Sequence, residues 1–174
     1  DDLIKEFINK LNSAIKRSVG LPSKVAGSKV IVTLVVKHLP ILKESHASVL
    51  MKTCTNQLSD RNETVAFAYA YAAGHLCRVA KIKTILNYGN FLKDLYFDYK
   101  DDKDRKIAAF GCEAIAKYST DNFNKVSSFF LPLAFVCQHD DVKEISEIFK
   151  TAWTENTGGN TAGREDMDEI AEIA

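Results

Sequence analysis

Histidine and cysteine are the residues of this sequence that could hold a metal ion or act as a nucleophile. They are His38, His46, His75, His139, Cys54, Cys77, Cys112 and Cys137. A zinc site needs ligands at close spacing, such as a CxxC pair or two histidines one helical turn apart. The chain has no CxxC pair, and its nearest candidates, His75 and Cys77, point to different faces of one helix. We therefore predict no metal site.

Other motifs with catalytic potential are incomplete. A catalytic cysteine needs a base within hydrogen-bond reach, but Cys112 and His75 lie out of register on the second helices of two neighbouring predicted hairpins. Residues 158–163 begin and end with glycine, in the frame of a phosphate-binding loop. In a phosphate-binding loop the second glycine is followed by Lys and then Ser or Thr. Here it is followed by Arg164 and Glu165. We predict a protein that is not an enzyme, with no cofactor and no small-molecule substrate.

Composition excludes further classes of protein. The chain has 23 basic and 23 acidic residues, whereas binders of nucleic acid or anionic membranes need a net basic face. No apolar run, that at 30–36 included, approaches the roughly 20 residues that span a bilayer. The cysteines lie in apolar contexts, which is typical of reduced thiols in a cytosolic or nuclear protein.

The chain repeats itself at a spacing that is typical of paired helices. Branched apolar residues recur about 40 positions apart, at Val25, Val65, Ile107 and Ile145. Five positions before each of them stand Gly20, Asp60, Asp102 and Asp140. An Asp before a helix can accept hydrogen bonds from the first-turn amides, so we predict that Asp60 and Asp102 cap the helices that follow.

Hydrophobic periodicity predicts eight helices. They cover about residues 2–18, 22–37, 41–57, 62–79, 83–99, 104–118, 121–137 and 142–155. Segments 29–36 and 66–71 have strand-like patterns, but we predict helices there because they occupy the same place in the repeat as the helix after Asp102. Pro132 is expected to kink the seventh helix. Phe110 lies on an apolar stripe and is predicted to be in the core.

The predicted fold is all-α, an α-solenoid of about four helical hairpins. The repeats are expected at about 1–39, 40–80, 81–119 and 120–157, followed by a Gly-rich loop at 158–163 and an acidic helix at 164–174 that begins a further repeat. The terminal hairpins of such an array keep one apolar face uncovered, and no capping repeat is visible. We therefore expect a slice of a longer array.

One group of basic residues lies on or just after two consecutive second helices of the hairpins. It consists of Arg78, Lys81, Arg105, Lys106 and Lys117. A basic strip of this kind is a candidate contact for an acidic partner. The alternative is a solvated face whose charge is balanced by Asp101, Asp102 and Asp104.

Five strings of sequence carry a family resemblance. In order, they are SVGLPSKVAGSKVIVTLV (18–35), LSDRN (58–62), AYAAGHLCR (70–78), LPLAFVCQH (131–139) and WTEN (153–156). Together they resemble the C-terminal half of the giant HEAT-repeat proteasome adaptor and scaffold family, the "extracellular mutant" component first named in yeast, and fungal members in particular. The resemblance covers nearly the whole chain.

The resemblance implies a curved solenoid that binds the 26S proteasome. Such a protein would tether the core particle to the regulatory particle and contribute to assembly quality control, in cytoplasm and nucleus. It implies no catalytic residue. Two alternatives stay open: another helical-repeat scaffold, such as a nuclear-transport receptor or phosphatase scaffold, and a small all-helical enzyme.

Overall fold

The computed structural model describes residues 2–98 and 101–157. These residues form nine α-helices and one short 3₁₀ helix, and no strand occurs among them. The helices are α1 (Asp2–Arg17), α2 (Leu21–His38), η1 (Leu39–Ile41), α3 (Glu44–Gln57), α4 (Glu63–Leu76), α5 (Ile82–Phe97), α6 (Asp102–Tyr118), α7 (Asp121–Asn124), α8 (Ser127–Cys137) and α9 (Lys143–Thr157). The predicted all-α class is confirmed, and segments 29–36 and 66–71 are helical.

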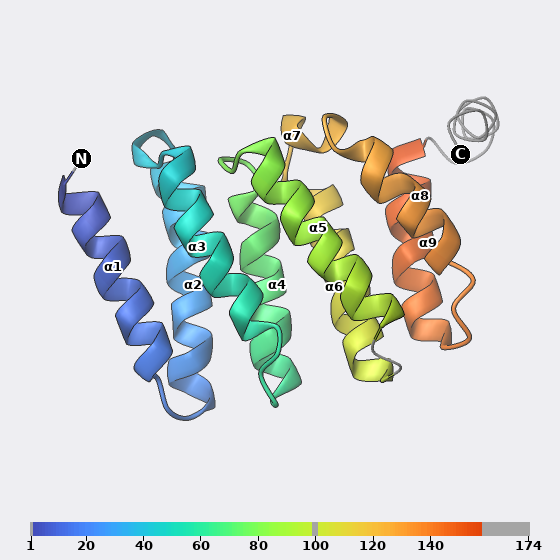
Figure 1. The fold of residues 1–174 in the computed structure, drawn as a ribbon, viewed down its shortest axis with the longest axis horizontal. Coiled ribbons are helices and arrows are strands. Elements are labelled where there is room, and N and C mark those ends of the chain that lie inside the picture. The colour runs from blue at the N-terminus through green and yellow to red at the C-terminus, as the bar shows by residue number, and fades with distance from the viewer. Residues whose placement is uncertain (1, 99–100, 158–174) are drawn as a thin grey trace.

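The helices pair into hairpins that stack side by side in chain order (Figure 1). The hairpins are α1–α2, α3–α4, α5–α6 and α7–α8 with α9. The first helices α3, α5 and α8 form one layer, while the second helices α2, α4, α6 and α9 form the other and contact one another in turn. This is the predicted solenoid. The predicted loop 158–163 and acidic helix 164–174 lie outside the described residues.

The second helices pack closely because their sequences are apolar on more than one side. A helix that is hydrophobic around its circumference is buried on several faces, and α4 lies between α2 and α6. Its buried residues include Tyr69, whose hydroxyl donates a hydrogen bond to the carbonyl of Lys24 at 2.9 Å. Gly74 brings α4 so near α6 that a Cβ there would meet the carbonyl oxygen of Ala114 at 2.5 Å.

The fourth hairpin departs from the predicted single helix over 121–137. The chain leaves the helical conformation at Val126, with φ −124° and ψ 2°, which separates α7 from α8. The Asn122 side chain donates hydrogen bonds to the carbonyls of Cys77, at 2.9 Å, and Arg78, at 3.3 Å. These bonds attach α7 to the end of α4. The helix breaks before Pro132, which lies inside α8, and the prediction of one continuous helix was wrong.

The caps of α4 and α6 lie one or two residues away from the predicted Asp60 and Asp102. Asn62 accepts the N–H of Thr64 at 2.9 Å, and Asp101 accepts that of Lys103 at 3.1 Å. Asp60 accepts the N–H of Asn62 within the turn and pairs with Lys24 of α2. Side-chain caps are therefore present at both helices, but Asn62 and Asp101 provide them in place of Asp60 and Asp102.

Replacing Asn62 by Ala is therefore expected to lower the free energy of unfolding by about 1 kcal/mol, because the amide of Thr64 loses its acceptor. Thermal and urea denaturation would measure the change. Asn56→Ala is the matched control, since it removes the same side chain from an exposed position within α3. Equal losses in the two variants would contradict the assignment of the cap.

Candidate interaction surface

The four cysteines are buried free thiols. Burial raises the pKa of Cys54, Cys77 and Cys112 far above the ordinary thiol value, and it raises the pKa of Cys137 to about 12. The thiolate is the form that attacks electrophiles and binds metals. These residues therefore have the environment of packing side chains and not of nucleophiles.

In the native chain, an aromatic disulfide reagent is expected to label all four thiols at least about a hundredfold more slowly than it labels free cysteine. The physical reason is that reaction requires local or global opening. The same chain in concentrated urea provides the control and should react fully and fast. Rapid labelling of any thiol before unfolding would contradict the buried arrangement.

His75 lies in an aromatic cluster at the C-terminal ends of α4 and α6. Its ring stacks on Tyr118 with centroids 4.3 Å apart and meets the edge of Tyr71 at 4.7 Å. Neither ring nitrogen has a hydrogen-bond partner, so His75 is not paired with Cys112. No group of three or more potential metal-binding side chains occurs within residues 2–98 and 101–157.

The free energy of unfolding is expected to fall as the pH drops below about 6.5, because burial and then the charge of Arg78 lower the pKa of His75 in the folded chain. The unfolded chain binds the proton first, so acid favours unfolding, with a slope of up to about 1.4 kcal/mol per pH unit. Urea titrations at pH 7.5 and 5.5 would measure this. His75→Phe should reduce the dependence, and His38→Gln, at an exposed position, should not.

The five basic residues proposed as a strip fall into two separate groups. Arg105 and Lys106 lie in the first turns of α6, whereas Lys117 lies in its last turn, about 16 Å away along the axis. Arg78 follows the C-terminus of α4, and Lys81 is the N-cap of α5. Arg105 and Lys106 thus form one group at the start of α6. Arg78, Lys81 and Lys117 form the other, at the opposite end of the second helices. The five residues do not form one continuous strip.

Arg105 is held in ion pairs within the protein. Its Nη1 atom lies 2.9 Å from Asp140 and 2.7 Å from Asp141, and its Nη2 atom lies 2.7 Å from Asp102. The Asp140 side chain is fully buried and also accepts the hydroxyl of Tyr96 at 2.6 Å. Arg105 thus joins the start of α6 to the turn between α8 and α9.

The other basic side chains are less constrained. The ammonium of Lys106 pairs with Glu144 at 2.7 Å, and that of Lys81 lies 3.7 Å from Glu44. Lys117 is exposed and lies 6.0 Å from the ring centroid of Tyr118. The salt bridge that its spacing from Glu113 would allow does not occur among the ion pairs of the described residues.

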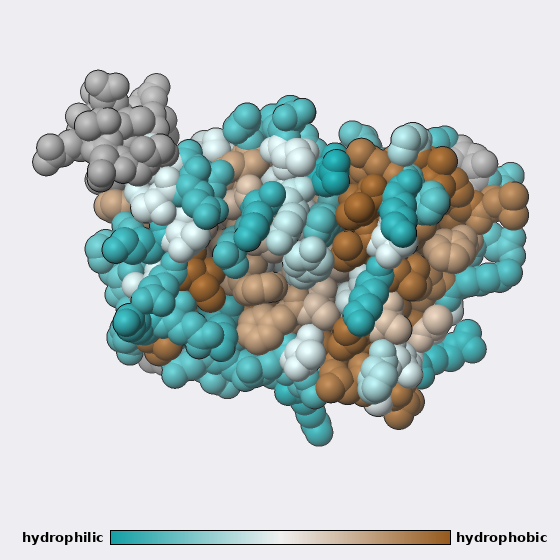
Figure 2. Space-filling view, turned by 180° about the vertical axis from the view of Figure 1, so that it is seen from behind, coloured by the Kyte–Doolittle hydropathy of each residue, from teal (hydrophilic) through white to brown (hydrophobic). Residues whose placement is uncertain are grey.

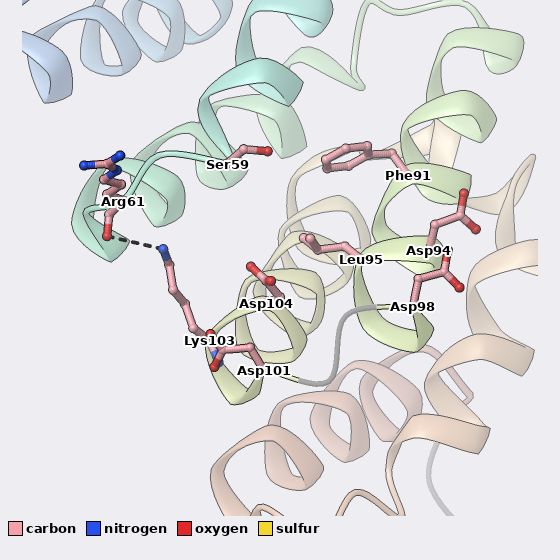
Figure 3. Close-up of a pocket in the computed structure, with 9 residues that line it drawn as sticks. All are labelled: Ser59, Arg61, Phe91, Asp94, Leu95, Asp98, Asp101, Lys103 and Asp104. Carbon is pink, nitrogen blue, oxygen red and sulfur yellow. Dashed lines mark hydrogen bonds between the residues drawn. The ribbon is translucent and has the colours of Figure 1, made fainter.

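A polar recess of about 620 Å³ lies between the turn after α3, the end of α5 and the start of α6. It is lined by Ser59, Arg61, Phe91, Asp94, Leu95, Asp98, Asp101, Lys103 and Asp104. Figure 3 shows the carboxylates of Asp94 and Asp98 pointing away from those of Asp101 and Asp104. Lys103 donates to the carbonyl of Arg61 at 3.3 Å. The carboxylates therefore do not converge on a common point.

An apolar groove of about 480 Å³ lies across the second helices α2, α4 and α6, and we name it the second-helix groove. It is lined by Val25, Ser28, Lys29, Val32, Thr33, Phe67, Ala68, Tyr71 and Phe110. Figure 2, seen from behind, shows hydrophobic residues concentrated over the N-terminal half of this face. Phe110 is half-buried and meets Phe67 edge-on with centroids 5.2 Å apart, so it packs against the edge of the core and not inside it as predicted.

The sequence pattern contains a signal for this groove that the repeat analysis missed. The apolar residues of α2 surround the helix instead of forming one stripe, and Val30 and Val36 remain exposed over 36% and 54% of their surface. A helix with apolar residues around its circumference, at the outer face of a two-layer array, leaves some of that apolar surface uncovered. The second-helix groove therefore results from how α2, α4 and α6 pack together, which sequence periodicity does not describe.

Comparison with known proteins identifies the family of this hairpin array. The family model of the HEAT-repeat domain of the proteasome adapter and scaffold protein ECM29 matches residues 1–97. The chain belongs to this family. The predicted resemblance is confirmed. The ECM29 family is thus favoured over nuclear-transport receptors and phosphatase scaffolds.

Relatives within the ECM29 family align beyond the residues that the family model matches. Proteasome component ECM29 of Saccharomyces cerevisiae is 34% identical over 89% of this chain and 8% of its own length. Proteasome adapter and scaffold protein ECM29 of Homo sapiens is 27% identical over 92% of this chain and 9% of its own length. The chain thus spans less than a tenth of either relative. No solved structure matches it.

Proposed function

We propose that the chain is a segment of a proteasome-associated scaffold that binds the 26S proteasome without catalysing a reaction. The observation that carries this proposal is the family match over residues 1–97, together with the 34% identity to a protein named as a proteasome component. Among the described residues, the burial of all four thiols is consistent with a binding role. In the same part of the chain, no helix has both the length and the apolarity to cross a bilayer.

The parent protein would tether the core particle to the regulatory particle and contribute to assembly quality control, in cytoplasm and nucleus. A stack of hairpins supports such a role because each added repeat extends the surface and can contact a second large body. Two weak contacts on one rigid array raise the joint affinity through effective concentration. We further propose Arg78, Lys81, Lys106 and Lys117 as contacts for acidic partner surfaces. Arg105, by contrast, is occupied within the fold.

A chimera tests the proposal directly. The segment of the Saccharomyces cerevisiae relative that aligns with this chain would be replaced by residues 1–157, and the chimera purified with intact proteasomes. We expect proteasome recovery within about twofold of the unaltered relative, because the exchanged segments belong to one family and are 34% identical. A phosphatase-scaffold segment of equal length is the control and should lower recovery. A folded chimera that recovers no more proteasome than this control would contradict the proposal.

A further inference from the structure

We propose that the second-helix groove binds one amphipathic helix of a partner protein, and that acidic residues flank the apolar stripe of this helix. The inference goes beyond the proposed function, since it specifies the chemistry of an occupant and does not depend on which protein supplies it. Three features of the groove each support one part of the proposal. They are its apolar lining, the hydrogen bonds of its hydroxyl groups and the charges at its edges.

The groove offers apolar surface that the chain itself leaves open. Val32 and Phe110 are half-buried on either side of it, and Val36, one turn beyond Val32, exposes 54% of its surface. Burying apolar area stabilises a complex, so a partner stripe of several aliphatic side chains would be stabilised here. Contiguous apolar surface of this kind is typical of protein-binding grooves.

The hydrogen bonds around the groove favour a helical occupant. The hydroxyl of Ser28 donates to the carbonyl of Val25, and that of Thr33 donates to the carbonyl of Lys29, each at 2.8 Å. The backbones of α2, α4 and α6 are bonded within their own helices. An extended peptide would find few partners for its amides and carbonyls, whereas an α-helix satisfies its own. The same shortage of free polar groups disfavours a small polar ligand.

The charges at the edges of the groove favour acidic flanks. Lys29 is the one charged residue of the lining, and it is exposed. Helix α2 carries three lysines and no carboxylate in 18 residues. At the opposite edge, the ammonium of Lys106 lies 5.8 Å from the ring centroid of Phe67 and pairs with Glu144 at 2.7 Å, in a pair that is partly exposed. Lys29 makes no ion pair among the described residues, and a partner carboxylate can replace Glu144 at the partly exposed Lys106. The groove thus complements a helix with acidic residues on both sides of its stripe, and Lys29 repels a basic one.

The test uses the 174-residue chain and synthetic peptides as probes. One peptide of about 18 residues carries leucines at helical spacing with glutamates on both flanks, and its partner carries lysines in place of the glutamates. Fluorescence anisotropy measures both affinities at low and moderate salt. We expect the acidic peptide to bind about tenfold or more tightly than the basic one.

Charge reversal locates the site. Lys29→Glu should weaken the acidic peptide about tenfold, because it places like charge at the edge of the groove. Lys52→Glu, at an exposed position on α3 in the opposite layer, carries the same change in net charge and should leave binding within about twofold. Val36→Asp should also weaken binding, whereas Val49→Asp, an exposed valine on α3, should not.

Three results would overturn the proposal. Equal affinity for the two peptides, or no binding of either, would refute the assigned chemistry. Equal losses of affinity in Lys29→Glu and Lys52→Glu would mean that the peptide is attracted by the net charge of the chain and that the groove is not the binding site. If sedimentation shows that the chain dimerises and that Lys29→Glu makes it monomeric, the occupant is a second copy of the chain.

Discussion

Replacing Arg105 by Ala is expected to lower the free energy of unfolding by about 3 kcal/mol. The physical reason is the burial of Asp140, whose side chain is fully buried and would lose the guanidinium 2.9 Å away. The loss also frees the start of α6 from the turn before α9, since Arg105 bonds to Asp102 and Asp141 as well. Urea denaturation followed by circular dichroism would measure the change.

Lys143→Ala is the control for this experiment, because it removes a cation from an exposed pair, 3.6 Å from Glu147. Exposed pairs of this kind contribute about 0–1 kcal/mol. Arg105→Lys should fall between the two variants, because one ammonium cannot reach all the carboxylates that the planar guanidinium contacts. A loss below about 1 kcal/mol for Arg105→Ala would show that the ion pairs do not hold the last hairpin in place.

Gly74→Ala is expected to destabilise the chain by about 2–3 kcal/mol, even though Ala is the better helix former. The added Cβ would lie 2.5 Å from the carbonyl oxygen and 2.6 Å from the carbonyl carbon of Ala114, which are backbone atoms of α6. The two helices would have to separate, and their contact is central to the array. Denaturant unfolding measures the cost.

Gly111→Ala provides a matched comparison on α6. Its Cβ would meet the end of the Leu92 side chain at 2.7 Å, and a flexible side chain can move aside at lower cost than a backbone. We expect its effect to stay within about 1 kcal/mol of zero, because the gain in helix propensity offsets part of the crowding. Similar effects of the two substitutions would contradict the backbone contact at Gly74.

Sequence periodicity predicts the hairpins well because burial imposes it directly. The apolar markers Val65 and Ile107 are fully buried at equivalent positions of α4 and α6. The β-branched segment 29–36 is helical because the repeat context outweighs local propensity. The predicted helices are therefore close to those observed wherever neighbouring hairpins cover an apolar face.

The features that the sequence does not predict depend on partners distant along the chain. The break between α7 and α8 accompanies bonds from Asn122 to carbonyls about 45 positions earlier. Arg105 was predicted as a partner contact, but its carboxylate partners near the start of α9 become visible only in three dimensions. Phe110 fits an apolar stripe equally well in a core or at the edge of a groove.

Electron microscopy of 26S proteasomes bound to a full-length ECM29-family protein that carries this segment tests the central claim most directly. The claim predicts that residues 2–157 form four helical hairpins in series within a longer rod that contacts the proteasome. A segment that folds otherwise, or a full-length protein that is absent from the particles under conditions where they are intact, would contradict it.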